Sequence, residues 1–161
     1  GLTTRRVPTR PLPQAIAHRY VLPTPLYGSV DAPNEEVFNR ICKPQWGSRA
    51  WDKFEQTIDL LPSLDTRIVC RHTLVKGENM NPEHLAQYAA LDNRADPDWI
   101  ECRGYVFVGH SREVMSLENM PSHDDVLELA NTIAPLVDRR LLDDSRLRRV
   151  ARVGQSGRAN V

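Results

Sequence analysis

Three segments share one pattern, in which a short apolar run is followed by polar side chains. They are Leu26–Pro33, Arg67–Met80 and Arg103–Arg112, and a fourth polar segment, Asn119–His123, follows soon after. Such runs are typical of buried strands, and in folds with parallel strands the carboxyl ends of the strands carry the chemistry. We therefore expect a functional site built from Ser29, Asp31, Arg71, Thr73, Lys76, Asn79, His110, Ser111, Arg112, Asn119 and His123.

The last two segments suit the rim of an active site or of an RNA-binding surface. An arginine such as Arg112 can pair with phosphate or stack on a base, and single-stranded RNA loops are read by such contacts. His123 could instead be an ordinary residue in the first turn of a helix, without a ligand. Lys76 could contact a phosphate or a carboxylate, form a Schiff base with a carbonyl substrate, or lie exposed in its loop.

Strands and helices must hold these side chains in place. Helices are expected to begin at Asn34, Gly47–Ser48, Asn81 and Ser122, beside capping residues or breakers. Between them, apolar runs predict strands at 26–30, 66–73, 99–108 (interrupted near Arg103) and 146–153. This alternation predicts an α/β fold with a parallel sheet and right-handed crossovers.

Composition limits the alternatives. The 161 residues suggest one domain, and 40% hydrophobic with 26% charged residues is globular composition. The 21 basic and 21 acidic residues cancel, so bulk charge does not argue for nucleic acid, although arginines gather at both ends. Three widely spaced cysteines favour a reduced, cytoplasmic protein and offer no metal site. No apolar run approaches the ~18 residues of a membrane span, and no signal peptide is visible.

Four segments together resemble a known family. Leu22–Pro33, Arg71–Met80, Arg103–Arg112 and Asn119–His123 are similar, in this order, to the C-terminal half of the radical SAM tRNA 4-demethylwyosine synthases. The resemblance implies an α/β fold, the C-terminal half of a partial parallel (β/α) radical SAM barrel. That half would span residues 26–153, after a proline-rich lead-in at 1–25 and before a frayed tail at 154–161.

The resemblance also implies an activity for the parent protein. Such enzymes use a [4Fe-4S] cluster and an external electron donor to cleave S-adenosylmethionine (SAM). With pyruvate, they convert N1-methylguanosine beside the anticodon of phenylalanine tRNA to 4-demethylwyosine. The implied SAM pocket is Ser29, Asp31, Arg71, Thr73 and Asn79, and the implied substrate or tRNA rim is Lys76, His110, Ser111, Arg112, Asn119 and His123.

Two of these assignments have structural alternatives. The Asp31 carboxylate could hold ribose hydroxyls of SAM, or it could cap the next helix. Arg71 and Thr73 alternate along a strand and so share one face, which either lines the barrel lumen or holds Arg71 in a structural ion pair. At three positions the sequence departs from the family's usual residues, namely Pro25, Gly28 and His110.

The family's iron–sulfur signature, C-x-x-x-C-x-x-C, is absent from this sequence. Cys42, Cys70 and Cys102 cannot replace it, because cluster ligands must converge on one point, and we expect them to pack as small buried hydrophobes. The chain is thus expected to be a fragment, inactive alone, whose partner is the N-terminal half of the barrel. Two alternatives stay open: a non-catalytic RNA-binding α/β module that uses the arginine-rich ends, and an aldolase-like α/β barrel enzyme with Lys76 as nucleophile.

Overall fold

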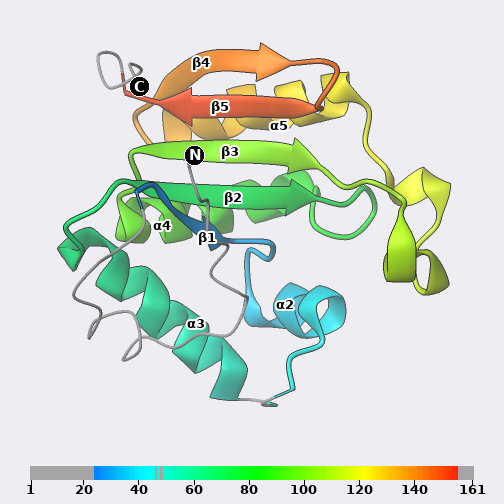
Figure 1. Cartoon of the computed structure of the whole chain (residues 1–161), viewed down its shortest axis with the longest axis horizontal. Helices are drawn as coiled ribbons and strands as arrows, with labels where there is room; N and C mark the ends of the chain where they lie inside the picture. The colour runs from blue at the N-terminus through cyan, green and yellow to red at the C-terminus, as the bar shows by residue number, and fades with distance from the viewer. Residues whose placement is uncertain (1–23, 46, 48, 156–161) are drawn as a thin grey trace.

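The computed structural model describes residues 24–45, 47 and 49–155 and shows a five-stranded sheet backed by helices (Figure 1). β1, β2 and β3 are parallel, whereas β5 runs antiparallel to both β3 and β4. The predicted α/β class is confirmed, but the expectation of a wholly parallel sheet is wrong for the last two strands. In spatial order the strands are β1 (Leu26–Ser29), β2 (Ile68–Leu74), β3 (Trp99–Gly104), β5 (Val150–Gly154) and β4 (Arg140–Ser145).

The connection between β4 and β5 explains the antiparallel pair. Only Arg146–Arg149 separate the two strands, which is enough for a hairpin and far too short for a parallel crossover. The sequence predicts these four residues inside a strand and does not predict β4, because β4 is an edge strand with a largely polar sequence.

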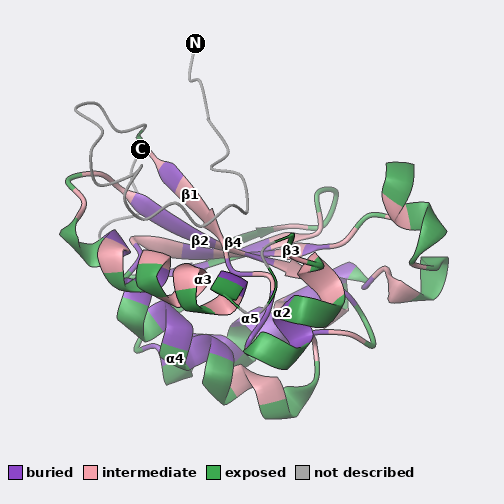
Figure 2. Ribbon diagram, turned by 90° about the horizontal axis from the view of Figure 1, so that it is seen from below, coloured by how far each residue is buried: buried purple, intermediate pink, exposed green. Residues whose placement is uncertain are grey.

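The third strand also ends earlier than predicted. The Tyr105 N–H still donates to the carbonyl of Leu74, but β2 ends at that leucine. Residues 105–108 therefore have no neighbouring strand to continue the ladder, and they leave the sheet. They begin an exposed arm, residues 105–119, that contains two 3-10 turns, Gly109–Glu113 and Leu117–Asn119 (Figures 1 and 2).

The predicted helix starts match the structure, and three of them have the predicted capping side chain. Asn34 accepts from the N–H of Val37 at 3.0 Å, and Ser122 and Asp125 form a reciprocal capping box. Asn81 caps a short 3-10 turn, Pro82–His84, that leads into the third helix. The helices are α2 (Glu35–Cys42), α3 (Arg49–Leu60, followed by the 3-10 turn Leu61–Ser63), α4 (Leu85–Ala95) and α5 (His123–Leu136).

The hydrophobic core lies between one face of the sheet and α3, α4 and α5. Alternate strand residues such as Cys70, Leu74 and Ile100 point to this side, where they meet Tyr88 and Ile133. Figure 2 shows the buried residues concentrated between strands and helices. No described helix covers the opposite face, so the remaining alternate positions of β1, β2, β3 and β5 are free to form a site.

The predicted lead-in, residues 1–25, lies outside the described residues except for its last two positions. Most of the predicted tail, 154–161, lies outside them as well, although Gly154 is the last residue of β5. Within the described part of the chain, no helix combines the length and apolar character needed to cross a membrane.

Candidate functional site

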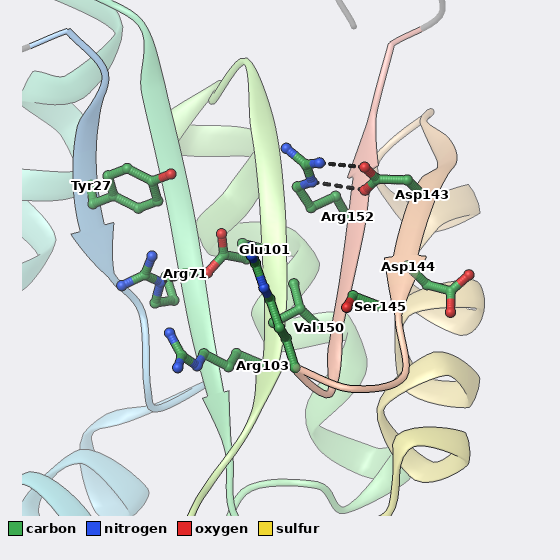
Figure 3. A pocket seen from close by; sticks show the side chains of 10 residues that line it. Tyr27, Arg71, Glu101, Arg103, Asp143, Asp144, Ser145, Val150 and Arg152 are labelled. Atoms are coloured by element: carbon green, nitrogen blue, oxygen red, sulfur yellow. Dashed lines mark hydrogen bonds and ion pairs between the residues drawn. The ribbon is translucent and has the colours of Figure 1, made fainter. Parts of the chain in front are cut away.

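A row of polar side chains crosses the open face of the sheet, one from each strand. Arg71 Nε lies 2.8 Å from Glu101 Oε1, and Arg152 Nε lies 2.7 Å from Asp143 Oδ1, with a second contact between the same two groups (Figure 3). Paired opposite charges on neighbouring strands stabilise a sheet and fix the side chains that form them. By strand register the row is Ser29, Arg71, Glu101, Arg152 and Asp143.

A second row lies two residues nearer the carboxyl ends of the parallel strands. It consists of Thr73, Arg103, Val150 and Ser145. Arg103 is half-buried, and its guanidinium has no ion-pair partner among the described residues. This places a positive charge without a counter-charge at the end of the sheet where parallel α/β folds bind their ligands.

All members of the two rows except Ser29 and Thr73 line a cleft of about 650 Å³ (Figure 3). Arg71 is held twice in it, by Glu101 and by the ring of Tyr27, whose centroid lies 4.4 Å from the guanidinium carbon. Four arginines line the cleft and face the carboxylates of Glu101 and Asp143, whereas the Asp144 carboxylate turns toward the helix layer, where it contacts His123. Because Arg103 and Arg148 have no ion-pair partner in the described chain, the cleft is suited to an anionic group such as a carboxylate or phosphate.

The residues predicted at the first two strand ends separate into two groups. Ser29, Arg71 and Thr73 lie on the open face. Arg71 forms the ion pair that was one alternative for it, and because it also lines the cleft, its place in a barrel lumen stays a prediction. The Asp31 carboxylate instead accepts from the backbone N–H of Thr73 at 2.9 Å, and burial raises its pKa. Since Asn34 caps α2, the alternative that Asp31 is the helix cap is wrong.

Asn79 is fully buried and bonded to backbone. Its Oδ1 accepts from the N–H of Val75 at 2.7 Å, and its Nδ2 donates to the carbonyls of Asp31 and Thr73, each at 2.8 Å. The side chain therefore fastens the loop after β2 to the end of β1. It does not line the cleft.

Lys76 and Asn119 join two loops on the helix side of the cleft. The Lys76 N–H donates to the Asn119 carbonyl, and Asn119 Nδ2 donates back to the Lys76 carbonyl, both at 2.9 Å. Lys76 Nζ lies 3.2 Å from Asp125 Oδ2. The lysine borders a separate hollow of about 610 Å³ between the start of α4 and α5 and does not line the open-face cleft.

The other rim candidates lie on the arm. His110 is exposed and pairs with Glu113 at 2.9 Å. Ser111 Oγ donates to the Val108 carbonyl at 2.7 Å, and the Arg112 guanidinium carbon lies 5.3 Å from the ring centroid of Phe107. These side chains organise the arm itself, which projects beyond the ends of β2 and β3 (Figure 1).

His123 connects the helix layer to the cleft. Its ring is buried at the start of α5, and its Nε2 lies 2.7 Å from Oδ2 of Asp144, a cleft residue on β4. Nδ1 has no hydrogen-bond partner in the described chain. The histidine is thus a buried contact behind the cleft and not part of an exposed rim.

The chain matches known proteins in both sequence and structure. Residues 94–154, which contain β3, α5, β4 and β5, match the family model described as wyosine base formation. A tRNA 4-demethylwyosine synthase of Pyrococcus horikoshii, which depends on SAM, is 39% identical over 137 residues, 83% of this chain and 39% of that protein. The chain is homologous to the 4-demethylwyosine synthases over part of their length.

Other 4-demethylwyosine synthases extend the comparison. The human enzyme TYW1 is 30% identical over 115 residues, which is 71% of this chain and 15% of that protein. A structure of TYW1 with a lysine–pyruvate adduct bound superposes with a TM-score of 0.78 and 31% identity, over 91% of this chain and 45% of that one. The crystal structure of archaeal TYW1 superposes with a TM-score of 0.71 and 26% identity, over 91% of this chain and 44% of that one. The chain spans less than half the length of these synthases.

The cysteines do not suit an iron–sulfur cluster of a SAM-dependent synthase. Cys70 and Cys102 are fully buried on the helix-covered side of the sheet, and burial raises the pKa of both thiols. Burial likewise raises the pKa of the half-buried Cys42 thiol, to about 12. Thiolates are the ligands of such clusters, and no three metal-binding side chains converge within the described chain.

Several cleft residues were absent from the sequence-based list. The alternation of Trp99, Glu101 and Arg103 with apolar Ile100 and Cys102 was a signal for two of them, because alternate residues of a strand share a face. Arg103 was instead predicted to lie near an interruption of the third strand. The cleft residues from β4 and β5 could not be assigned without knowing the hairpin; the missed set is Tyr27, Glu101, Arg103, Asp143, Asp144, Ser145, Arg148, Val150 and Arg152.

Proposed function

We propose that this chain is the C-terminal part of a radical SAM enzyme that modifies tRNA. In the reaction, N1-methylguanosine beside the anticodon of phenylalanine tRNA becomes 4-demethylwyosine, with pyruvate as the carbon donor. The support for this proposal is the homology to 4-demethylwyosine synthases together with a charged sheet face that no described helix covers. The open face is then one wall of the reaction chamber, and the rest of the barrel closes over it.

The observation that carries the proposal is the pairing pattern inside the cleft. Arg71, Glu101, Arg152 and Asp143 neutralise one another, whereas Arg103 has no ion-pair partner in the described chain. We assign Arg103 to the carboxylate of SAM or of pyruvate, since an arginine binds a carboxylate with two parallel hydrogen bonds. Ser29, Arg71 and Thr73 lie on the same face and would line the SAM side of the chamber.

We assign the iron–sulfur cluster to the N-terminal half of the barrel, outside these residues, where an external electron donor would reduce it. When bound, the cluster supplies the electron that cleaves SAM. The residues of this chain would bind and orient SAM and the substrate. Asp31 and Asn79 would act indirectly, by fixing the loops at the ends of β1 and β2 that position the binding residues.

One TYW1 structure has a lysine–pyruvate adduct bound. The three lysines of this sequence are Lys43, Lys53 and Lys76, and none lines the cleft. We therefore place the pyruvate-binding lysine outside this chain. Treating the chain with pyruvate and borohydride is expected to leave it unlabelled. An adduct that disappears in Lys76→Ala would favour the aldolase-like alternative instead.

The test is product formation by the complete gene product that contains this chain. The protein is reconstituted anaerobically and supplied with SAM, pyruvate, a reductant and tRNA that carries N1-methylguanosine, and nucleosides are analysed by mass spectrometry. Arg103→Ala is expected to lower kcat/KM at least about 10-fold, since removing a partner from a buried charge pair costs ~2 kcal/mol or more. The matched control is Arg49→Ala, an exposed arginine at the start of α3.

The outcomes separate the parts of the proposal. Absence of 4-demethylwyosine from the complete gene product would remove the enzymatic assignment and favour the RNA-binding alternative. Unchanged kinetics in Arg103→Ala would remove only the role of that arginine. SAM cleavage by the 161-residue chain alone would contradict the expectation that the fragment is inactive.

A further inference from the structure

The hairpin turn Arg146–Arg149, between β4 and β5, lies at the functional end of the sheet. The N–H of Gly104, the last residue of β3, donates to the carbonyl of Arg149 at 2.9 Å. Figure 1 shows the turn on the same side as the carboxyl ends of β2 and β3. Three of its four residues are arginines, so the chain concentrates positive charge beside the cleft mouth.

The charge of this turn is largely uncompensated. Arg146 pairs with Asp124 at 2.9 Å, but the two side chains are 74% and 72% exposed, and such pairs hold little energy. Arg148 and Arg149 have no ion-pair partner in the described part of the chain, and Arg148 also lines the cleft. The turn therefore adds two open guanidinium groups next to Arg103.

The remaining residue of the turn is a leucine that contributes nothing to the core. Leu147 is 95% exposed, more than any other large hydrophobic residue described. A turn that only had to connect two strands would favour polar residues or glycine. An apolar side chain set between arginines instead suits a surface that is both anionic and partly apolar.

We propose that the hairpin turn binds the sugar–phosphate backbone of RNA, with Arg148 and Arg149 on phosphates and Leu147 against a ribose or base. This inference rests on the proposed function, which supplies tRNA as the RNA. RNA offers both components, because its phosphates pair with arginine while the faces of its unstacked bases accept apolar contacts. The turn would hold the tRNA against the cleft mouth while the target base enters.

The experiment measures the affinity of the complete gene product for an unmodified tRNA transcript at several KCl concentrations, without SAM, pyruvate or reductant. Each phosphate contact contributes about one unit to the slope of log Kd against log salt. Arg148→Ala is expected to reduce this slope by about 1. Arg149→Asn is expected to do the same, and asparagine tolerates the positive φ of 49° at that position.

Two further variants complete the set. Leu147→Ser is expected to weaken binding several-fold without changing the salt slope, because it removes an apolar contact and no charge. Arg49→Ala, on α3, is expected to leave both affinity and slope unchanged. Melting temperatures of all variants should equal that of the parent, since the exposed turn residues contribute little to the core.

Equal slopes of log Kd against log salt in the parent and both arginine variants would overturn the inference. The enzymatic proposal would be unaffected, since the product-formation assay tests it separately. Absence of measurable tRNA binding by the parent at low salt would overturn the inference too. So would a turn-dependent binding to anionic phospholipid vesicles that exceeds binding to tRNA. Because no cofactor is present, a failure to make 4-demethylwyosine does not affect this result.

Discussion

Replacing Asn79 with alanine tests whether this residue holds the fold or contacts a ligand. The side chain is 0% exposed and serves three backbone groups, the N–H of Val75 and the carbonyls of Thr73 and Asp31. The carbonyl of Asp31 keeps a second donor, the Tyr88 hydroxyl at 3.2 Å. The N–H of Val75 and the carbonyl of Thr73 thus lose their hydrogen bond to Asn79, and no other described side chain replaces it.

The size of the effect follows from that count. A buried polar group left without a partner costs about 1 to 3 kcal/mol, so with two such groups Asn79→Ala should lower the free energy of unfolding by about 2 to 6 kcal/mol. Domains are stable by only about 5 to 15 kcal/mol. With a urea m-value of about 2 kcal/mol/M, the midpoint should move down by roughly 1 to 3 M.

The assay is urea denaturation of the ligand-free chain, followed by circular dichroism and tryptophan fluorescence. The matched control is Asn93→Ala, because Asn93 is exposed and its only described hydrogen bond, to the Leu136 carbonyl, is 3.4 Å long. The control should change stability by less than about 0.5 kcal/mol. A loss below about 1 kcal/mol in Asn79→Ala would refute the structural reasoning and favour a direct role of Asn79 in binding SAM.

Three other results are expected. Burial disfavours the charged form of His72, but the Asp92 carboxylate 2.9 Å away raises its pKa overall. A histidine whose pKa is higher in the folded than in the unfolded protein stabilises the fold, and this contribution is complete when the pH lies below the unfolded pKa of about 6.5. Urea midpoints should therefore fall as pH rises from about 6.5 through the raised pKa, and a flat profile, or one unchanged in His72→Gln, would contradict this. Leu74→Ala should cost about 2 to 5 kcal/mol because Leu74 is fully buried, whereas equal melts of this variant and the exposed-site control Leu147→Ala would argue against the core described. Ellman's reagent at pH 8 should label Cys42, Cys70 and Cys102 only slowly in the native chain, since burial raises the pKa of each thiol and limits access to the sulfur atoms. Rapid labelling of any of the three before denaturation would contradict the burial described.

Local signals in the sequence determined the elements that depend on near neighbours. Asn34 and Ser122 cap helices because their side chains meet N–H groups only three residues away. The alternation along β2 placed Arg71 and Thr73 on one face, as the structure confirms. Four ordered segments were also sufficient to indicate the homology to the synthases.

Only the tertiary structure decided which charges stand together. Arg71, Glu101, Arg152 and Asp143 come from four strands up to 81 residues apart, and their row exists because the register aligns them. Strand pairing is non-local, so no window of sequence contains it. The same pairing turned an arginine-rich segment into a hairpin, left Arg103 without a partner in the described chain, and placed Asn79 in the interior among backbone groups.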